Sequence, residues 1–447
     1  MTRKITVLLL PLALLSLRAG AQDPWTLDRC IDYAIENNIS VQQTKLRSDN
    51  QAIQLNTAEN SRLPGVNASL GTGMNFGRGI GEKNVYENKT TSNSSLGISA
   101  GASLFEGGRI RHTIAGRRLD LQAALKDLER AREDVSLNIT SLYLKVLFNK
   151  ELLKVAESQV ELSKGQLERS EQLFKSGKNP ESVVFESRAL LAKDELSLTQ
   201  SRNALTLSLL DLSQALNRES VDGFDIRVPE LDEITLTAMG QMEKPDAVYG
   251  YAVENRPGIQ AEKLRVQSSE KNLLVAKAAR YPQISLGASV NDNFYYNIGP
   301  GQNKAFFKQL KDNLGEGVSL SVSIPIFNRL STRNSIRSSQ IAIQNQHLAL
   351  LESQQALRKQ IEQAYYTAEA AFQKYLSAVK SLEAAREAFR YEEEKAAAGR
   401  STIFDFNDAK TRMEKSESDM VQAKFEFIFQ RKILDFYAGE PLTFAKY

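Results

Sequence analysis

Cysteine and histidine are scarce in this chain, whose 447 residues include one cysteine and two histidines. A single thiol cannot form a disulfide within the chain, and so few thiols and imidazoles nearly exclude zinc and iron–sulfur sites. The sequence also shows no arrangement of serine, histidine and aspartate typical of hydrolases. We therefore expect no enzyme activity, no metal and no cofactor.

Long hydrophobic runs are absent after residue 21, so the sequence contains no transmembrane helix beyond that point. The first 21 residues begin with two basic residues, continue with an apolar stretch over residues 5–17 and end in Ala19-Gly20-Ala21. This order is typical of a cleaved secretory signal, and we expect residues 1–21 to be removed. Cys30 does not lie at the cleavage point, so we expect a packed helical residue rather than a lipid-modified terminus.

An excess of charge of one sign is also lacking. The formal charge of +3 comes from three basic residues within the first 21, and the remainder carries 54 basic and 54 acidic side chains. Nucleic-acid binding therefore has no global electrostatic support, and we expect no nucleic-acid partner. With 42% hydrophobic residues, the composition is otherwise that of a chain that folds.

The sequence contains an internal duplication. Identical residues recur after 218 positions for Glu36-Asn37 and Arg62-x-Pro64, and after 222 positions for Phe105, Ile139, Tyr143 and Gly177. Single matches are weak, but eight at two constant offsets indicate two copies of one plan. The predicted organisation is a first repeat over 22–217, a linker over 218–245, a second repeat over 246–439 and a C-terminal tail over 440–447.

Each repeat contains a long heptad pattern. Alternating steps of four and three residues from Leu121 to Phe174 meet apolar side chains at 12 of 16 positions, and the same steps from Ile343 to Ala396 do so at 13 of 16. This pattern predicts coiled-coil helices near 110–175 and 330–397, each about 100 Å long. Helices of this length build an elongated molecule rather than a globular one.

Shorter helical patterns flank each long one. Gly177 and Gly399 are placed to end the long helices, as glycine commonly does. Helices are predicted to follow at 180–217 and 401–437 and to precede at 38–62 and 257–280. The economical arrangement is one long helix beside two shorter ones stacked end to end.

Between the short and long helices the apolar period changes from 3.5 to 2. Aliphatic residues alternate with serine and glycine over 95–104 and 317–326, and weaker alternation occurs near 66–70 and 284–290. We predict β-hairpins at about 64–105 and 282–327, with loops at 77–93 and 297–315. Strands of about 10 residues suit a tilted bilayer crossing. Two soluble hairpins with one buried face are the alternative, which the export signal disfavours.

Four strands in lipid cannot seal themselves, because their edges would carry unsatisfied backbone groups. Closure between chains is therefore predicted. Two chains would give eight strands filled by side chains, whereas three would give twelve strands and begin to leave a lumen. The serine and glycine face would line that lumen, so a homotrimeric pore is the favoured interpretation.

Two segments resemble the TolC family of outer-membrane efflux proteins: Gly399-Arg400-Ser401-Thr402-Ile403-Phe404-Asp405-Phe406-Asn407-Asp408 and Thr26–Asn38. The resemblance implies a mainly α fold with a small β part, namely a long antiparallel α-helical barrel plus a 12-stranded transmembrane β-barrel shared by three protomers with four strands each. It implies an outer-membrane channel-tunnel reaching into the periplasm. Its partners would be a periplasmic adaptor protein, an inner-membrane pump of the RND or ABC type, and outer-membrane lipid.

The resemblance also assigns roles to residues. Asp405 and Asp408 lie three apart on one helix face, and in a trimer each would form a ring of three carboxylates that acts as a periplasmic gate. Ordinary aspartates in a first helical turn are the alternative. Arg400 lies one position from the family's usual basic tether. The turns would contact the adaptor through Ser176, Gly177, Lys178, Gly399, Arg400, Ser401 and Thr402.

Small-molecule efflux is therefore the expected function, with the outer-membrane part of a type I protein secretion system as an alternative. A structural or adhesive trimeric coiled coil on the cell surface is a rival from another class, and the alternating hairpins in both halves disfavour it. A periplasmic adaptor is a second rival, which the duplication disfavours.

Overall fold

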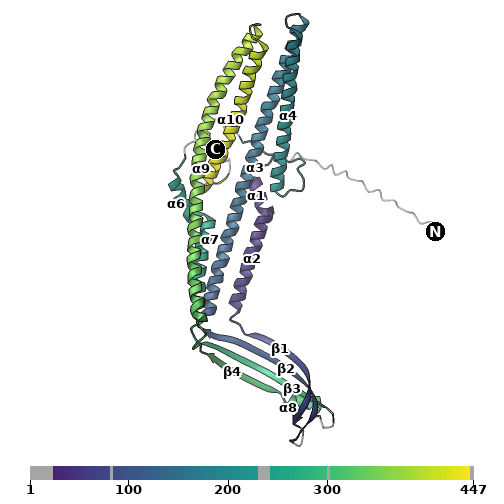
Figure 1. Cartoon of the computed structure of the whole chain (residues 1–447), viewed down its shortest axis with the longest axis vertical. Helices are drawn as coiled ribbons and strands as arrows, with labels where there is room; N and C mark the ends of the chain where they lie inside the picture. Colours follow the sequence, from purple (N-terminus) through teal and green to yellow (C-terminus); the bar gives the residue numbers. More distant parts are fainter. Residues whose placement is uncertain (1–23, 81–83, 230–241, 300–302, 443–447) are drawn as a thin grey trace, which may run out of the picture.

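The computed structural model describes residues 24–80, 84–229, 242–299 and 303–442. An elongated helical body carries a four-stranded sheet at one end (Figure 1). The first repeat contains α1 (Leu27–Asn37), α2 (Ile39–Asn60), β1 (Gly65–Ile80), β2 (Tyr86–Glu106), α3 (Arg109–Lys175) and α4 (Glu181–Ala215). The second contains α6 (Pro245–Asn255), α7 (Pro257–Ala278), β3 (Gln283–Ile298), α8 (Phe306–Asp312), β4 (Gly315–Ser323), α9 (Ser331–Ala397) and α10 (Ile403–Tyr437). The same order occurs twice, apart from α8, which confirms the duplication.

The long helices α3 and α9 have 67 residues each, which corresponds to about 100 Å. Their bounds confirm the predicted helices to within a residue. The 22-residue α2 and the 35-residue α4 lie along α3, and α7 and α10 of the same two lengths lie along α9 (Figure 1). The predicted stacking of short helices beside a long one is therefore confirmed. Packing of α3 on α7 and α10 joins the repeats.

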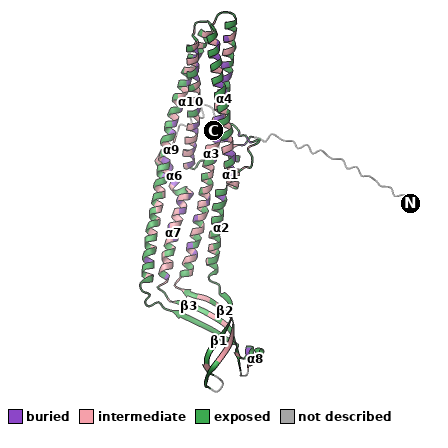
Figure 2. Cartoon of the chain, turned by 45° about the vertical axis from the view of Figure 1, so that its right-hand side comes forward, coloured by how far each residue is buried: buried purple, intermediate pink, exposed green. Residues whose placement is uncertain are grey.

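The largest core of the described residues lies where α1, α3, α4, α9 and α10 meet. Ile139, Tyr143 and Phe427 are fully buried there, whereas most residues of the helical body are exposed or half-buried (Figure 2). The Tyr143 hydroxyl lies 3.1 Å from the Trp25 carbonyl oxygen and 2.6 Å from that of Arg227. Cys30 on α1 is fully buried in the same core, which confirms its packing role.

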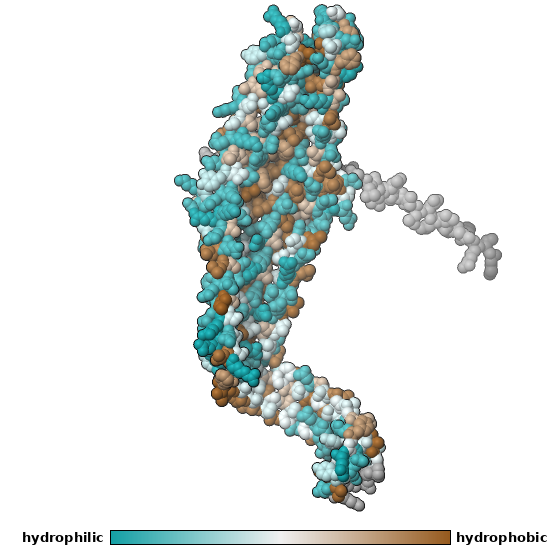
Figure 3. Space-filling view, viewed as in Figure 1, coloured by the Kyte–Doolittle hydropathy of each residue, from teal (hydrophilic) through white to brown (hydrophobic). Residues whose placement is uncertain are grey.

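The sheet has the strand order β1-β2-β3-β4, and all neighbours are antiparallel. The central pair β2–β3 joins the two repeats. The register places Leu70, Leu96 and Asp292 in one row across β1, β2 and β3. Residues with even numbers therefore share the aliphatic face, and the serine and glycine residues share the other. Hydrophilic side chains cover most of the helical body, whereas the sheet surface is more apolar (Figure 3).

The first predicted hairpin loop, 77–93, was too long, whereas the second, 297–315, agrees with the ends of β3 and β4 to within two residues. β1 continues to Ile80 and pairs there with Tyr86 of β2, because small polar side chains pack on a strand ladder as readily as in a loop. The second predicted loop contains α8, which the sequence analysis missed. β4 ends at Ser323, before Pro325, since proline cannot donate to the ladder.

No helix in the part of the chain that the structure describes is long and apolar enough to cross a membrane. The predicted signal at 1–21 lies outside the described residues, as do 230–241 of the predicted linker and 443–447 of the predicted tail. The boundaries of the repeats, the linker and the tail stay predictions.

Candidate functional site

The far end of the helical body consists of two turns with the same backbone. Gly177 and Gly399 end α3 and α9 with φ angles of 71° and 69°, in the left-handed region that favours glycine. At the second turn, the N–H of Gly399 donates to the Ala396 carbonyl at 3.2 Å and that of Arg400 to the Lys395 carbonyl at 2.9 Å. The first turn repeats this pair of bonds, which satisfies the last carbonyls of both long helices.

The predicted tip residues lie at these turns. The exposed members are Ser176, Gly177 and Lys178 in the first turn and Gly399, Arg400 and Thr402 in the second. Ser401 is half-buried, because its hydroxyl donates to the Glu392 carboxylate. This bond, together with one from Lys395, lowers the pKa of Glu392. Both tips are therefore exposed, but Ser176 lies on the surface of the first, whereas Ser401 in the second is fixed by a hydrogen bond to Glu392.

Asp405 takes part in the start of α10. Its N–H donates to Thr402 Oγ1 at 3.1 Å, and the Thr402 hydroxyl donates to Asp405 Oδ2 at 2.6 Å. Thr402 is the N-cap residue, so this reciprocal pair satisfies an otherwise orphaned helix donor. The carboxylate is exposed and also lies at the positive end of the helix dipole.

Asp408 lies one turn further along α10 and is half-buried. Its carboxylate forms an ion pair with Arg412 on the same helix. Both aspartates thus have partners on the same chain, and these contacts give each of them a structural role in starting α10. The structure brings them to one end of the body, as expected, and their role as a gate stays a prediction.

A buried ion cluster near the tips was missed by the sequence analysis. Lys410 on α10 is 1% exposed, and its Nζ lies 2.6 Å from Asp194 Oδ2 on α4. The ammonium also donates to Ser163 Oγ on α3 and lies 3.0 Å from Glu414 Oε1. Three helices therefore meet at one lysine. A detectable signal existed, since Lys410 occupies the apolar stripe of Phe406 and Met413.

The two helical hairpins, the first formed by α3 and α4 and the second by α9 and α10, also touch near their tips. Arg169 Nη2 on α3 donates to the Ala396 carbonyl at the end of α9 over 2.9 Å. Between α9 and α10, the rings of Phe389 and Phe406 pack with centroids 5.4 Å apart. The position of the α9–α10 turn is therefore set by contacts to both hairpins.

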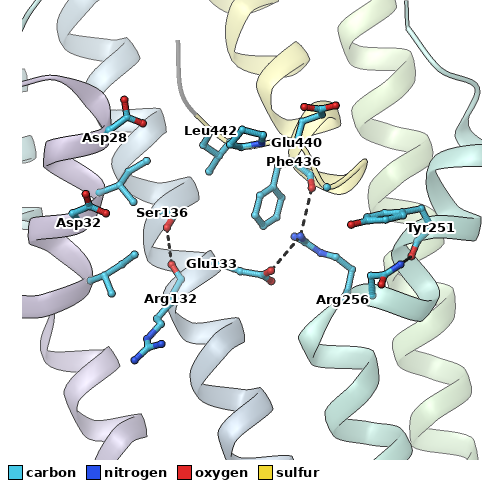
Figure 4. A pocket seen from close by; sticks show the side chains of 15 residues that line it. Asp28, Asp32, Arg132, Glu133, Ser136, Tyr251, Arg256, Phe436, Glu440 and Leu442 are labelled. Atoms are coloured by element: carbon cyan, nitrogen blue, oxygen red, sulfur yellow. Dashed lines mark hydrogen bonds and ion pairs between the residues drawn. The ribbon is translucent and has the colours of Figure 1, made fainter. Parts of the chain in front are cut away.

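A cavity of about 580 Å³ lies at the middle of the body, beside the end of α10 (Figure 4). Arg256 faces it, with Nη1 3.4 Å from Glu133 Oε1 and 3.5 Å from the Phe436 carbonyl. Its guanidinium also lies 3.6 Å from the centre of the Phe436 ring. Burial lowers the pKa of Arg256 and raises that of Glu133. These contacts join the second repeat to α3.

Comparison with known proteins shows which family has this architecture. The model of the family "Outer membrane efflux protein" matches residues 30–218 and again 248–439. Toxin and drug export protein A of Aggregatibacter actinomycetemcomitans is 20% identical over 411 residues, which are 90% of this chain and 83% of that protein. The probable outer membrane lipoprotein SilC of Salmonella typhimurium is 23% identical over 278 residues, 60% of this chain. That match spans 55% of SilC, so the chain aligns with about half of its length.

A solved structure of the CusC transmembrane channel has the same fold. The superposition has a TM-score of 0.78 with 15% sequence identity and covers 93% of this chain and 92% of CusC. The two family matches fall on the two repeats and together cover most of the chain. The chain therefore belongs to the outer membrane efflux protein family of trimeric channels, and it is a transport channel rather than an enzyme.

Proposed function

We propose that this efflux channel is the passive exit duct for small molecules in a tripartite pump. The sheet lies in the outer membrane, and the helical body crosses the periplasm towards an inner-membrane pump. The chain is exported with residues 1–21 removed. The duct performs no bond chemistry, and its energy comes from a pump of the RND or ABC type.

The observation that carries the proposal is the pair of free sheet edges. β1 and β4 each pair on one side only within the chain, so each presents a row of backbone donors and acceptors. Hydrocarbon does not tolerate such rows. Pairing β4 of one copy with β1 of the next removes both edges, and three copies close twelve strands around a lumen lined by serine and glycine.

Disulfide trapping tests this closure. Cysteines at Ser69 in β1 and Ser319 in β4 lie on the serine and glycine face, and within one chain the two strands β2 and β3 separate them. With neighbouring cysteines at Gly317 and Ser321 to scan the register, we expect oxidation in membranes to give covalent trimers. The control pairs Ser69→Cys with Ser285→Cys in the interior strand β3 and should give none. Monomers at every β4 position would contradict the shared barrel.

The adaptor is expected to dock at the two tips. They are the parts of the body furthest from the sheet, so they face the inner membrane (Figure 1). Ser176→Cys and Ser401→Cys, each with a bifunctional reagent, should capture a periplasmic adaptor in cells. Asn88→Cys at the opposite end of the molecule is the control. Capture only from position 88 would invert the orientation.

Three copies would also bring the Asp405 and Asp408 carboxylates of the second hairpins into two rings at the periplasmic entrance. Such rings attract cations and repel anions. Asp405 bonds to Thr402 and Asp408 to Arg412 within the same chain. These bonds hold both carboxylates in the first turns of α10, at the end of the body where the rings would form.

Small-molecule efflux and protein secretion make different demands on cells. A strain lacking the channel should accumulate an ethidium-type dye, and its secreted proteins should be unchanged. Normal dye export together with the loss of one secreted protein would favour the type I secretion alternative.

A further inference from the structure

We propose that α8 is a binding site for a phosphorylated lipid of the outer leaflet, in which Lys308 and Lys311 hold the phosphates and Phe307 contacts the acyl chains. The inference rests on the proposed membrane position of the sheet. It concerns a short helix of the second repeat, and the described residues 84 and 85 between β1 and β2 form no corresponding helix.

The α8 segment is held against the sheet by a row of side-chain amides. Gln309 is buried, and its Oε1 accepts from the Tyr295 N–H while its Nε2 donates to the Tyr295 carbonyl, both at 2.9 Å. Asn303 makes the same two bonds with Asn297, at 2.7 and 2.9 Å. These amides take the place of β4, whose pairing with β3 stops at Asn291. The helix is therefore a built element of the sheet edge.

The helix lies over the aliphatic face of the sheet. Phe306 and Leu310 close a cavity of about 120 Å³ against Leu70, Leu96 and Phe294, and the Phe294 and Phe306 ring centroids are 5.0 Å apart. The row through Leu70 and Leu96 is the one that faces lipid under the proposed function. Hence α8 is on the outside of the barrel.

The depth of α8 matches the headgroup level. β3 pairs with β4 over nine residues, 283–291, a length that suffices for about one tilted bilayer crossing. The amide bonds to Tyr295 and Asn297 come directly after this stretch, at the end of the sheet away from the helical body (Figure 1). Aromatic residues are typical of this level, and Tyr295, Tyr296 and Phe307 are all exposed here.

The outward face of α8 combines apolar surface with positive charge. Phe307 is 81% exposed. Lys308 and Lys311 are exposed, three apart on one helix face, and no described residue forms an ion pair with either. Asp312 is paired with Lys304 at 3.1 Å, and Asp292 lies beneath the helix in the cavity, so neither carboxylate neutralises the two lysines. Basic side chains on a helix at the membrane interface attract anionic lipid headgroups, and aromatic side chains beside them enter the boundary with the acyl chains.

Native mass spectrometry of the full-length protein in mild detergent tests the site, with diphosphoryl lipid A as the probe. We expect Lys308→Gln/Lys311→Gln to weaken lipid A binding about tenfold without changing the oligomer. Lys45→Gln/Lys359→Gln removes the same charge from exposed positions on the helical body and should bind like the unsubstituted protein. Phe307→Ser should also weaken lipid A binding, because it removes the contact to the acyl chains. Inorganic phosphate should not displace lipid A from the unsubstituted protein.

Equal lipid A binding by the two lysine pairs would overturn the proposal, and so would displacement of lipid A by inorganic phosphate, which would indicate a site for free anions. A disulfide between Phe307→Cys and Phe76→Cys of a second copy would show that the neighbouring chain covers the helix, and would also overturn it. A trimer that binds no lipid A defeats this proposal alone, whereas a monomer in detergent defeats the shared barrel as well.

Discussion

The two hairpin tips share a backbone and differ in what fills them. Between α3 and α4, the hydroxyls of Ser170 and Ser187 bond to each other at 2.9 Å, and both residues are 1% exposed. At the offset of 222, the equivalents of Ser170 and Ser187 are Glu392 and Ala409, and the rings of Phe389 and Phe406 pack nearby between α9 and α10. α4 begins without a side-chain cap, whereas Thr402 caps α10. The duplication has kept the glycine turn while the contacts around it have diverged.

This difference gives the two hairpins different parts in one joint. The first hairpin supplies a polar interior with Ser163 and Asp194, and the second supplies the Lys410 ammonium that enters it. The Arg169 contact to the α9 end adds to the same joint. If the second hairpin moves when the duct opens, these are the contacts that have to break.

Lys410→Met should weaken the contact between the two hairpins more than any other single substitution that we propose. It leaves the Asp194 carboxylate buried without its cation, and breaking a buried pair in this way costs about 3–5 kcal/mol. We expect a clear fall in the thermal unfolding midpoint of the trimer, measured by circular dichroism. Lys410→Met/Asp194→Asn removes both charges and should recover most of the loss. A single variant as stable as the unsubstituted protein would mean that the cluster does not hold the joint.

Asp405→Ala/Asp408→Ala tests whether only the second hairpin carries the gate. Removing two carboxylate rings should raise single-channel conductance several-fold and weaken cation preference in a planar bilayer. The matched change in the first hairpin is Glu181→Ala/Glu186→Ala, near the start of α4, where conductance should hardly change. Unchanged currents from the aspartate variant would leave these residues with only their roles at the start of α10.

Local periodicity made the helical body predictable from sequence. The heptad steps and the two glycines placed α3 and α9 to within a residue, because a helix and its end depend on side chains a few positions apart. The alternation over 95–104 likewise indicated β2. The first loop was predicted too long because glycine, asparagine and serine fit both a turn and an exposed strand.

Contacts between distant segments could not be predicted in the same way. Lys410 and Asp194 are 216 positions apart, and nothing in their neighbourhoods states that they meet. The helix α8 escaped notice because its seven residues are too few to show a helical period, and because the Gln309 amide that holds it bonds to β3, 14 positions away. Asp405 and Asp408 were found through a resemblance, and their bonds to Thr402 and Arg412 required the structure.

Glu414→Gln should change how the joint between the hairpins depends on pH. Burial raises the pKa of Glu414, against the opposing effect of Lys410. Because the folded-state pKa lies above the unfolded one, this contribution to stability is present at low pH and is lost as the pH rises through the raised value. The unsubstituted protein should therefore gain stability relative to the variant as the pH falls through the raised pKa of Glu414. The exposed Glu181→Gln in the first hairpin is the control, and parallel pH profiles for both would contradict the prediction.

Thiol labelling should show the smallest effect and compare the tips most directly. Cys30 is fully buried, and burial raises its pKa to about 12, so a maleimide should not label it in the folded protein. Against that silent background, Ser176→Cys at the exposed first tip should react quickly. Ser401→Cys should react more slowly, because position 401 is half-buried beside the Glu392 carboxylate, which disfavours the thiolate. Mass spectrometry after timed quenching gives the rates, and unfolding in denaturant should equalise them. Equal rates in the folded trimer would mean that the two turns expose their serines alike, so that the difference between the hairpins lies only in their interiors.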